Sequence, residues 1–145
     1  MSGAERATVT VSLEIAASPD RVFDEWLNPD RAKRWLFSTP TGEMIRAELD
    51  PRVGGKFVYT DRRDGVDIDH MGEFLEIDRP HRLTFTFSVP HYSSESTTVR
   101  LWFEPTPVGC EVALHHEGIL PEWAEPSRQG WTEILAKLAA AVEGK

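Results

Sequence analysis

The chain has 145 residues, of which 40% are hydrophobic and 28% charged, and this size and composition are typical of a single globular domain, expected here over residues 1–145. Its 16 basic and 24 acidic side chains give a formal net charge of −8, which argues against binding to nucleic acid or to an anionic membrane surface. The single cysteine, Cys110, excludes an intrachain disulfide and a multi-cysteine metal site.

The N-terminal part predicts one strand and two short helices. Residues 8–15 alternate strictly between polar and apolar side chains, the pattern of a strand with one solvated face. Ser18-Pro19-Asp20 then supplies an N-cap, a proline at the first helical position and an acid in the first turn, and an apolar stripe continues to Leu27. Asn28-Pro29-Asp30 repeats this start signal and predicts a second short helix that reaches Leu36.

The middle of the chain, from residue 44 to about 117, predicts strands separated by turns. Gly, Pro and Asp mark the connections, and Arg63-Asp64-Gly65 is typical of a tight hairpin. Links this short make sequential strands pair antiparallel. The six expected strands are 44–49, 56–60, 68–77, 83–89, 97–103 and 111–116.

The C-terminal part predicts a long helix. Apolar residues recur at helical spacing from Trp131 to Val142, while Glu133 and Lys137 form an i, i+4 pair on the polar side. Because proline limits how far back a regular helix extends, residues 120–126 are expected to form a lead-in or a lid.

This order of elements indicates an α+β fold, in which a seven-stranded antiparallel sheet curves around the C-terminal helix. Such a sheet encloses more volume than the apolar side chains on one face of the C-terminal helix can fill. Either large side chains occupy the remaining space or a cavity is left.

Several short motifs, taken in order, resemble the activator of Hsp90 ATPase homologue 1-like branch of the START/Bet v 1 (helix-grip) superfamily, over roughly residues 8–142. They are Ala17-Ser18-Pro19-Asp20-Arg21-Val22-Phe23 and Trp35, Gly54-Gly55-Lys56-Phe57, Gly72-Glu73-Phe74-Leu75-Glu76-Ile77 with Pro80 and Leu83-Thr84-Phe85, Val99 to Pro105, and Gly130-Trp131. The resemblance implies a helix-grip fold with a hydrophobic cavity between sheet and helix, which members use for lipids, hormones, polyketides or aromatic compounds.

Strand alternation selects the side chains that face this expected cavity. The four phenylalanines in the set are either core or cavity wall, the histidines are either structural or ligand-facing, and Gly72 marks either a bulge or room for a ligand. Loops around 37–43 and 90–95 are expected to gate the opening. The candidate residues are Trp35, Phe57, Tyr59, His70, Gly72, Phe85, Phe87, Phe103, His116, Trp131 and Leu135.

No metal or cofactor is expected. His115 and His116 are neighbours in a predicted strand and so point to opposite faces, and the acidic residues of 64–69 lack the spacing of an EF-hand. Motifs of serine hydrolases, P-loops and dinucleotide-binding sites do not occur. Cys110 has no basic neighbour in the sequence and is expected to be an inert buried thiol.

We therefore expect a binding protein for a hydrophobic or aromatic small molecule. The alternative is a cyclase- or dehydratase-like enzyme that uses His70 or Tyr59 as a general acid or base in the same cavity. Trp102 on the outer face leaves homodimerisation or an interaction role open. An Hsp90 co-chaperone or interaction module is the further alternative. Hsp90 activation is the less expected of these roles, because the eukaryotic co-chaperone's action depends largely on a separate N-terminal domain and this chain begins close to its first strand.

The expected location is the cytoplasm. No apolar run approaches the length of a membrane span, and the first residues lack the basic and apolar regions of a signal peptide. Neither nucleic acid nor membrane is an expected partner.

Overall fold

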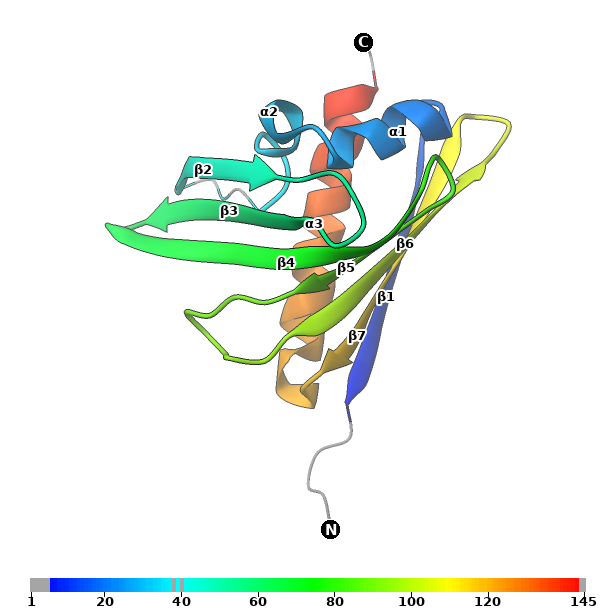
Figure 1. Cartoon of the computed structure of the whole chain (residues 1–145). Helices are drawn as coiled ribbons and strands as arrows, with labels where there is room; N and C mark the ends of the chain where they lie inside the picture. The colour runs from blue at the N-terminus through cyan, green and yellow to red at the C-terminus, as the bar shows by residue number, and fades with distance from the viewer. Residues whose placement is uncertain (1–5, 38, 40, 144–145) are drawn as a thin grey trace.

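A computed structural model describes residues 6–37, 39 and 41–143 of the chain (Figure 1). Its elements follow the predicted order, and most strands extend one to three residues beyond the predicted limits. They are β1 (Ala7–Ile15), α1 (Pro19–Trp26), α2 (Pro29–Ala32), β2 (Glu43–Leu49), β3 (Lys56–Arg63), β4 (Val66–Asp78), β5 (Arg82–Phe87), β6 (Thr97–Pro105), β7 (Cys110–Ile119), the 3₁₀ turn η1 (Pro121–Trp123) and α3 (Ala124–Val142).

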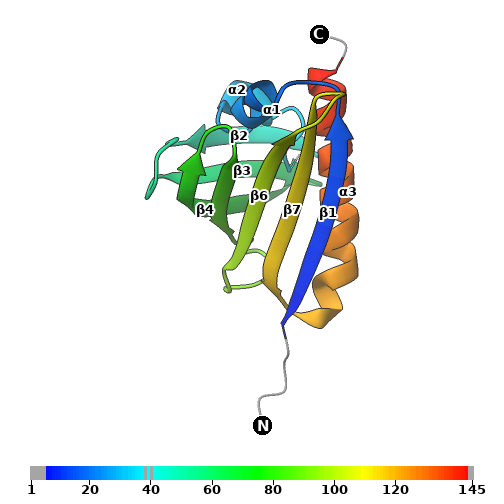
Figure 2. The ribbon, with the colours of Figure 1, turned by 90° about the vertical axis from the view of Figure 1, so that its right-hand side faces the viewer.

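The seven strands form one antiparallel sheet in the order β1-β7-β6-β5-β4-β3-β2. The sheet curls, and α3 crosses its inner face (Figure 1). Figure 2 shows α3 alongside the β1 edge, with α1 and α2 above one end of the sheet. The α+β helix-grip architecture expected from the sequence is thereby confirmed.

Alternation along the strands decides which side chains enter the core. Val99, Leu101 and Phe103 of β6 are buried, as predicted, and the α1 residue Phe23 packs edge-on against Phe103 with 5.1 Å between ring centroids. The last helix contributes a buried stripe that follows its 3.6-residue period. This stripe consists of Trp131, Leu135, Leu138, Ala139 and Val142.

Local signals account for the helix starts and for one hairpin. The Ser18 hydroxyl accepts a hydrogen bond from the Arg21 backbone N–H at 3.2 Å and caps α1. Between β3 and β4, Asp64 and Gly65 both have positive φ, 52° and 79°, as a two-residue type I′ turn requires. The predicted tight hairpin is therefore confirmed.

Two helix boundaries differ from the sequence-based expectation. The second helix ends at Ala32 rather than reaching Leu36, and the chain continues through turns. The last helix begins at Ala124 and includes Pro126, so residues 124–126 are not part of a separate lead-in. Proline is accepted there because the first backbone N–H groups of a helix have no intrahelical partner to lose.

Candidate functional site

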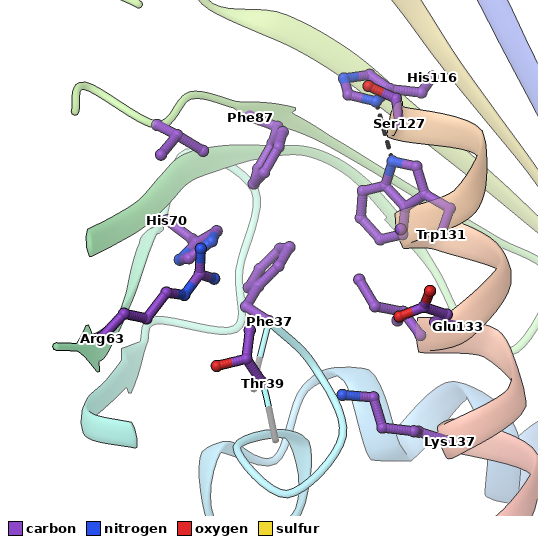
Figure 3. A pocket seen from close by; sticks show the side chains of 13 residues that line it. Phe37, Thr39, Arg63, His70, Phe87, His116, Ser127, Trp131, Glu133 and Lys137 are labelled. Atoms are coloured by element: carbon purple, nitrogen blue, oxygen red, sulfur yellow. Dashed lines mark hydrogen bonds between the residues drawn. The ribbon is translucent and has the colours of Figure 1, made fainter. Parts of the chain in front are cut away.

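A pocket with a volume of about 240 Å³ lies between the ends of β4 and β5 and the first half of α3 (Figure 3). Most of its wall is apolar, and charged or hydroxyl-bearing side chains are placed around it. Its lining consists of Phe37, Thr39, Arg63, His70, Phe87, Val89, His116, Ser127, Gly130, Trp131, Glu133, Ile134 and Lys137.

Three nearly parallel rings form one side of the pocket. The ring of Phe37 stacks on His70, with centroids 4.7 Å apart and 10° between the planes, and on Phe87, at 5.1 Å and 13°. His70 and Phe87 are themselves only 6.2 Å apart, so Phe37 lies over both rings rather than between them. The indole of Trp131 meets Phe37 nearly edge-on at 5.9 Å. The arrangement offers flat stacking and edge contacts to an aromatic ring.

His116 is held in a chain of hydrogen bonds that joins α3 to three strands. The indole N–H of Trp131 donates to His116 Nδ1 at 2.9 Å. Because an indole can only donate, Nδ1 carries no proton, and the protonated Nε2 donates to Thr97 Oγ1 at 2.7 Å. The Thr97 hydroxyl donates to the Phe87 carbonyl at 3.0 Å. Both ring nitrogens are thus used structurally.

His70 presents a different tautomer to the pocket. Its Nδ1 lies 3.3 Å from the Tyr59 carbonyl oxygen, which can only accept, so Nδ1 carries the proton and Nε2 keeps a lone pair. Burial lowers the pKa of His70 to about 4, and the positive charge of Arg63 adds to this effect. Burial alone lowers the pKa of His116 to about 4. Both imidazoles are therefore neutral at pH 7.

The buried carboxylate of Asp61 holds the guanidinium of Arg63 beside His70. Asp61 is fully buried, and its Oδ2 accepts hydrogen bonds from Arg63 Nε at 2.7 Å and from the Thr39 hydroxyl at 2.9 Å. These contacts hold the Arg63 guanidinium at the pocket, close to the imidazole of His70 (Figure 3). The β-sheet side of the pocket thus carries a cation beside aromatic rings, and the α3 side combines Trp131 and Ile134 with the polar side chains of Ser127, Glu133 and Lys137 (Figure 3).

Four of the eleven candidate residues from the sequence line this pocket, namely His70, Phe87, His116 and Trp131. The others lie elsewhere. Phe57, Tyr59 and Phe85 border a second, inner hollow of only about 10 Å³, so the interior under the sheet is largely filled by side chains. The indole of Trp35 donates to Glu25 Oε1 at 3.3 Å, outside the pocket.

The remaining candidates have packing roles. Phe103 contacts Phe23, and Leu135 is fully buried in the core. A side chain at Gly72 would collide with the backbone carbonyl of Thr86, and β4 is irregular near this point, where its pairing with β5 shifts register. The geometry thus shows a close approach of the Thr86 backbone at Gly72, which leaves no room for a ligand at this position.

Nine of the thirteen lining residues were not among the candidates, and among them Phe37, Thr39 and Arg63 lie on the β-sheet side of the pocket. The loop 37–43 was expected to gate the opening, and Phe37 and Thr39 indeed border it, while residues 38 and 40 lie outside the described part of the chain. A phenylalanine in a segment rich in turn-forming residues was the available signal. Its positive φ of 62°, which turns the ring inward, has no signature in the sequence.

Two further hollows lie nearby. One of about 220 Å³ shares Phe87 and His116 with the main pocket and is bordered by exposed Tyr92 and Trp123 from the 90–95 loop and η1. The other, of about 540 Å³, lies among α1, α2 and the second half of α3. Its lining is largely charged and consists of Arg21, Glu25, Arg31, Arg34, Trp35, Lys137, Ala140 and Ala141.

Other chemistry has little geometric support in this region. Within residues 6–37, 39 and 41–143, no three His, Cys, Asp or Glu side chains are grouped so as to hold a metal ion. Burial raises the pKa of the Cys110 thiol to about 11, which keeps it protonated and unreactive. No helix in the described part of the chain has the length and apolarity to cross a membrane.

Comparisons with known proteins agree with this architecture. The family model described as "Activator of Hsp90 ATPase homolog 1-like protein" matches residues 16–143. A Chromobacterium violaceum protein superposes with a TM-score of 0.83 and 24% identity, covering 95% of this chain and 99% of that one. The comparison with curated proteins finds no match.

Two further structures show the same fold. An AHSA1-like protein from Aeromonas hydrophila has a TM-score of 0.82 and 22% identity, over 94% of this chain and 92% of its own. A Staphylococcus aureus protein of unknown function has a TM-score of 0.84 and 18% identity, over 97% and 96%. Given the family match over residues 16–143, the chain belongs to the activator of Hsp90 ATPase homologue 1-like family.

Proposed function

We propose that this protein binds a hydrophobic or aromatic small molecule in the pocket between β4, β5 and α3. The observation that carries the proposal is the combination of stacked aromatic rings with a buried neutral imidazole, His70, at the pocket wall. An apolar wall with a few placed polar groups is the usual form of a small-molecule site. Arg63 adds a cation that favours a ligand with a polar or negative end.

The size of the pocket limits the buried part of a ligand to one or two rings, and the rest can extend out of its open side. A closed cavity of about 150 Å³ accommodates benzene, and this pocket measures about 240 Å³. A ligand that loses about 200 Å² of apolar surface gains roughly 5 kcal/mol from that burial, and the loss of translational and rotational freedom on association offsets part of it. Hydrogen bonds to His70 would strengthen and orient that binding.

The same groups bear on the enzymatic alternative. His70 Nε2 is placed to act as a general base in a cyclase- or dehydratase-like reaction. A base is most effective when its pKa lies near the working pH, whereas burial lowers the pKa of His70 to about 4. Tyr59 does not border this pocket and its pKa is raised by burial. These properties favour carriage over catalysis.

A pocket-filling substitution tests the proposal. Ile134 lines the pocket from α3, whereas Ala136 lies exposed on the same helix. We expect Ile134→Trp to weaken binding of the dye 1-anilinonaphthalene-8-sulfonate at least tenfold, because the indole takes up the ligand's space. Fluorescence titration gives the Kd, and Ala136→Trp adds the same bulk outside the pocket. Equal dye affinity in both variants and the parent would reject this site.

A further inference from the structure

Phe37 lies between the pocket and the inner hollow among the core side chains. Of the described residues that line the two, it is the one they share. Its ring covers His70 and Phe87 on the pocket side and meets Tyr59 nearly edge-on at 5.8 Å. Movement of this one ring would join the pocket of about 240 Å³ to the interior of about 10 Å³, with the volume of the ring itself added.

Two of the residues that line the inner hollow, Trp26 and Tyr59, each carry a buried polar group without a partner. Trp26 Nε1 and the Tyr59 hydroxyl have no hydrogen-bond partner among the described residues, although the two side chains are only 2% and 1% exposed. Leaving such groups unsatisfied is costly, so a buried group of this kind calls for an explanation. The indole can only donate, and burial raises the pKa of Tyr59, which keeps its proton available for donation.

The backbone of Phe37 is held in an unfavourable conformation. Its φ of 62° lies in the left-handed region, which bulky side chains rarely adopt. The stacking on His70 and Phe87 compensates for this cost. A ligand ring in the same place would make the same contacts and release the backbone of Phe37.

We infer that the Phe37 ring occupies the position of a ligand ring and gates a deeper polar subsite. In the bound state, a flat aromatic ring lies on His70 and Phe87, and an acceptor oxygen at its inner end receives hydrogen bonds from the Tyr59 hydroxyl and the Trp26 indole. This inference rests on the proposed function and narrows the ligand class to aromatic molecules with a carbonyl or ether oxygen at one end, as in an aryl ketone.

The polar subsite is tested with two probes of similar shape, acetophenone, which has an acceptor oxygen, and ethylbenzene, which has none. Tyr59→Phe removes the unpartnered hydroxyl and keeps the ring. We expect the free protein's Tm to stay equal or rise, and acetophenone binding to weaken at least fivefold while the ethylbenzene Kd changes less than twofold. Calorimetric titration and thermal unfolding give both quantities. Equal weakening for both probes, or no change for acetophenone, would overturn the subsite.

The gate is tested with Phe37→Ala, which opens the space, and Phe37→Leu, which keeps apolar bulk and safeguards folding. Binding of both probes is expected to tighten at least tenfold in Phe37→Ala and by less in Phe37→Leu. Unchanged or weaker binding in these variants would contradict the gate. If the parent binds both probes and Tyr59 and Phe37 variants change nothing, this inference fails and the proposed function stands. If neither the parent nor Phe37→Ala binds any probe, both fail.

Discussion

Replacing Trp131 with alanine is expected to destabilise the protein by about 4 kcal/mol, the range for loss of a buried indole. Trp131 is 3% exposed and contacts the rings of Phe37, Phe87 and His116. Its N–H also donates a hydrogen bond to His116 Nδ1. The substitution therefore removes packing and leaves a buried acceptor unpaired. Urea unfolding followed by circular dichroism measures the loss.

Trp131→Phe separates the two contributions. The phenyl ring keeps much of the packing but cannot donate to His116, so we expect a loss of about 2 kcal/mol. Trp123→Phe is the matched control, because Trp123 is 46% exposed and its ring lies against that of the exposed Tyr92. A Trp131→Phe protein as stable as the Trp123→Phe control would show that the hydrogen bond to His116 does not hold α3.

Stability is expected to fall as the pH is lowered from 7 to 5. The pKa values of His70 and His116 are lowered to about 4 in the folded protein, against about 6.5 in an unfolded chain. Between these values the unfolded state binds more protons, so stability rises with pH through this window and is lost on acidification. Each histidine contributes about 2 kcal/mol to the change between pH 7 and pH 5.

Urea unfolding at pH 7, 6 and 5 measures this dependence, and the window ends at pH 5 because carboxylates begin to titrate below it. His116→Gln is expected to remove about half of the slope, since glutamine does not titrate, and His70→Gln the other half. His91→Gln is the control, because His91 is exposed. A parent protein whose stability is flat from pH 7 to 5 would show that the two imidazoles are not held neutral by burial.

The sequence predicted the fold around the site more accurately than it predicted the residues that line the pocket. Period-two alternation in β5 and β6 correctly assigned Leu83, Phe85, Val99 and Leu101 to the inner face, because strand geometry fixes side-chain direction. How far the sheet curls, and how much of its interior side chains fill, depends on packing between distant segments. Phe57 and Phe85 meet edge-on at 5.3 Å between ring centroids and leave almost no space between sheet and helix at that point. The larger pocket therefore lies elsewhere, beside residues 127–137 of α3.

The contribution of Phe37 and its loop to the pocket wall could not be predicted from the periodicity of the sequence. Phe37 follows a short helix and lies outside any alternating segment, and its inward direction depends on a positive φ. The roles of the two histidines likewise depend on cross-strand partners. His116 meets Trp131 across 15 residues of sequence and Thr97 across 19, contacts that exist only once β6, β7 and α3 are assembled.

Intermolecular nuclear Overhauser effects between the protein and 1-anilinonaphthalene-8-sulfonate test the central claim most directly, because they locate a bound molecule within a few ångströms. We expect cross-peaks from the naphthyl protons to the side chains of Phe87, Ile134 and Trp131, which line the pocket. Cross-peaks confined to Tyr92 and Trp123, in the neighbouring hollow, or no cross-peaks at saturating dye, would contradict it.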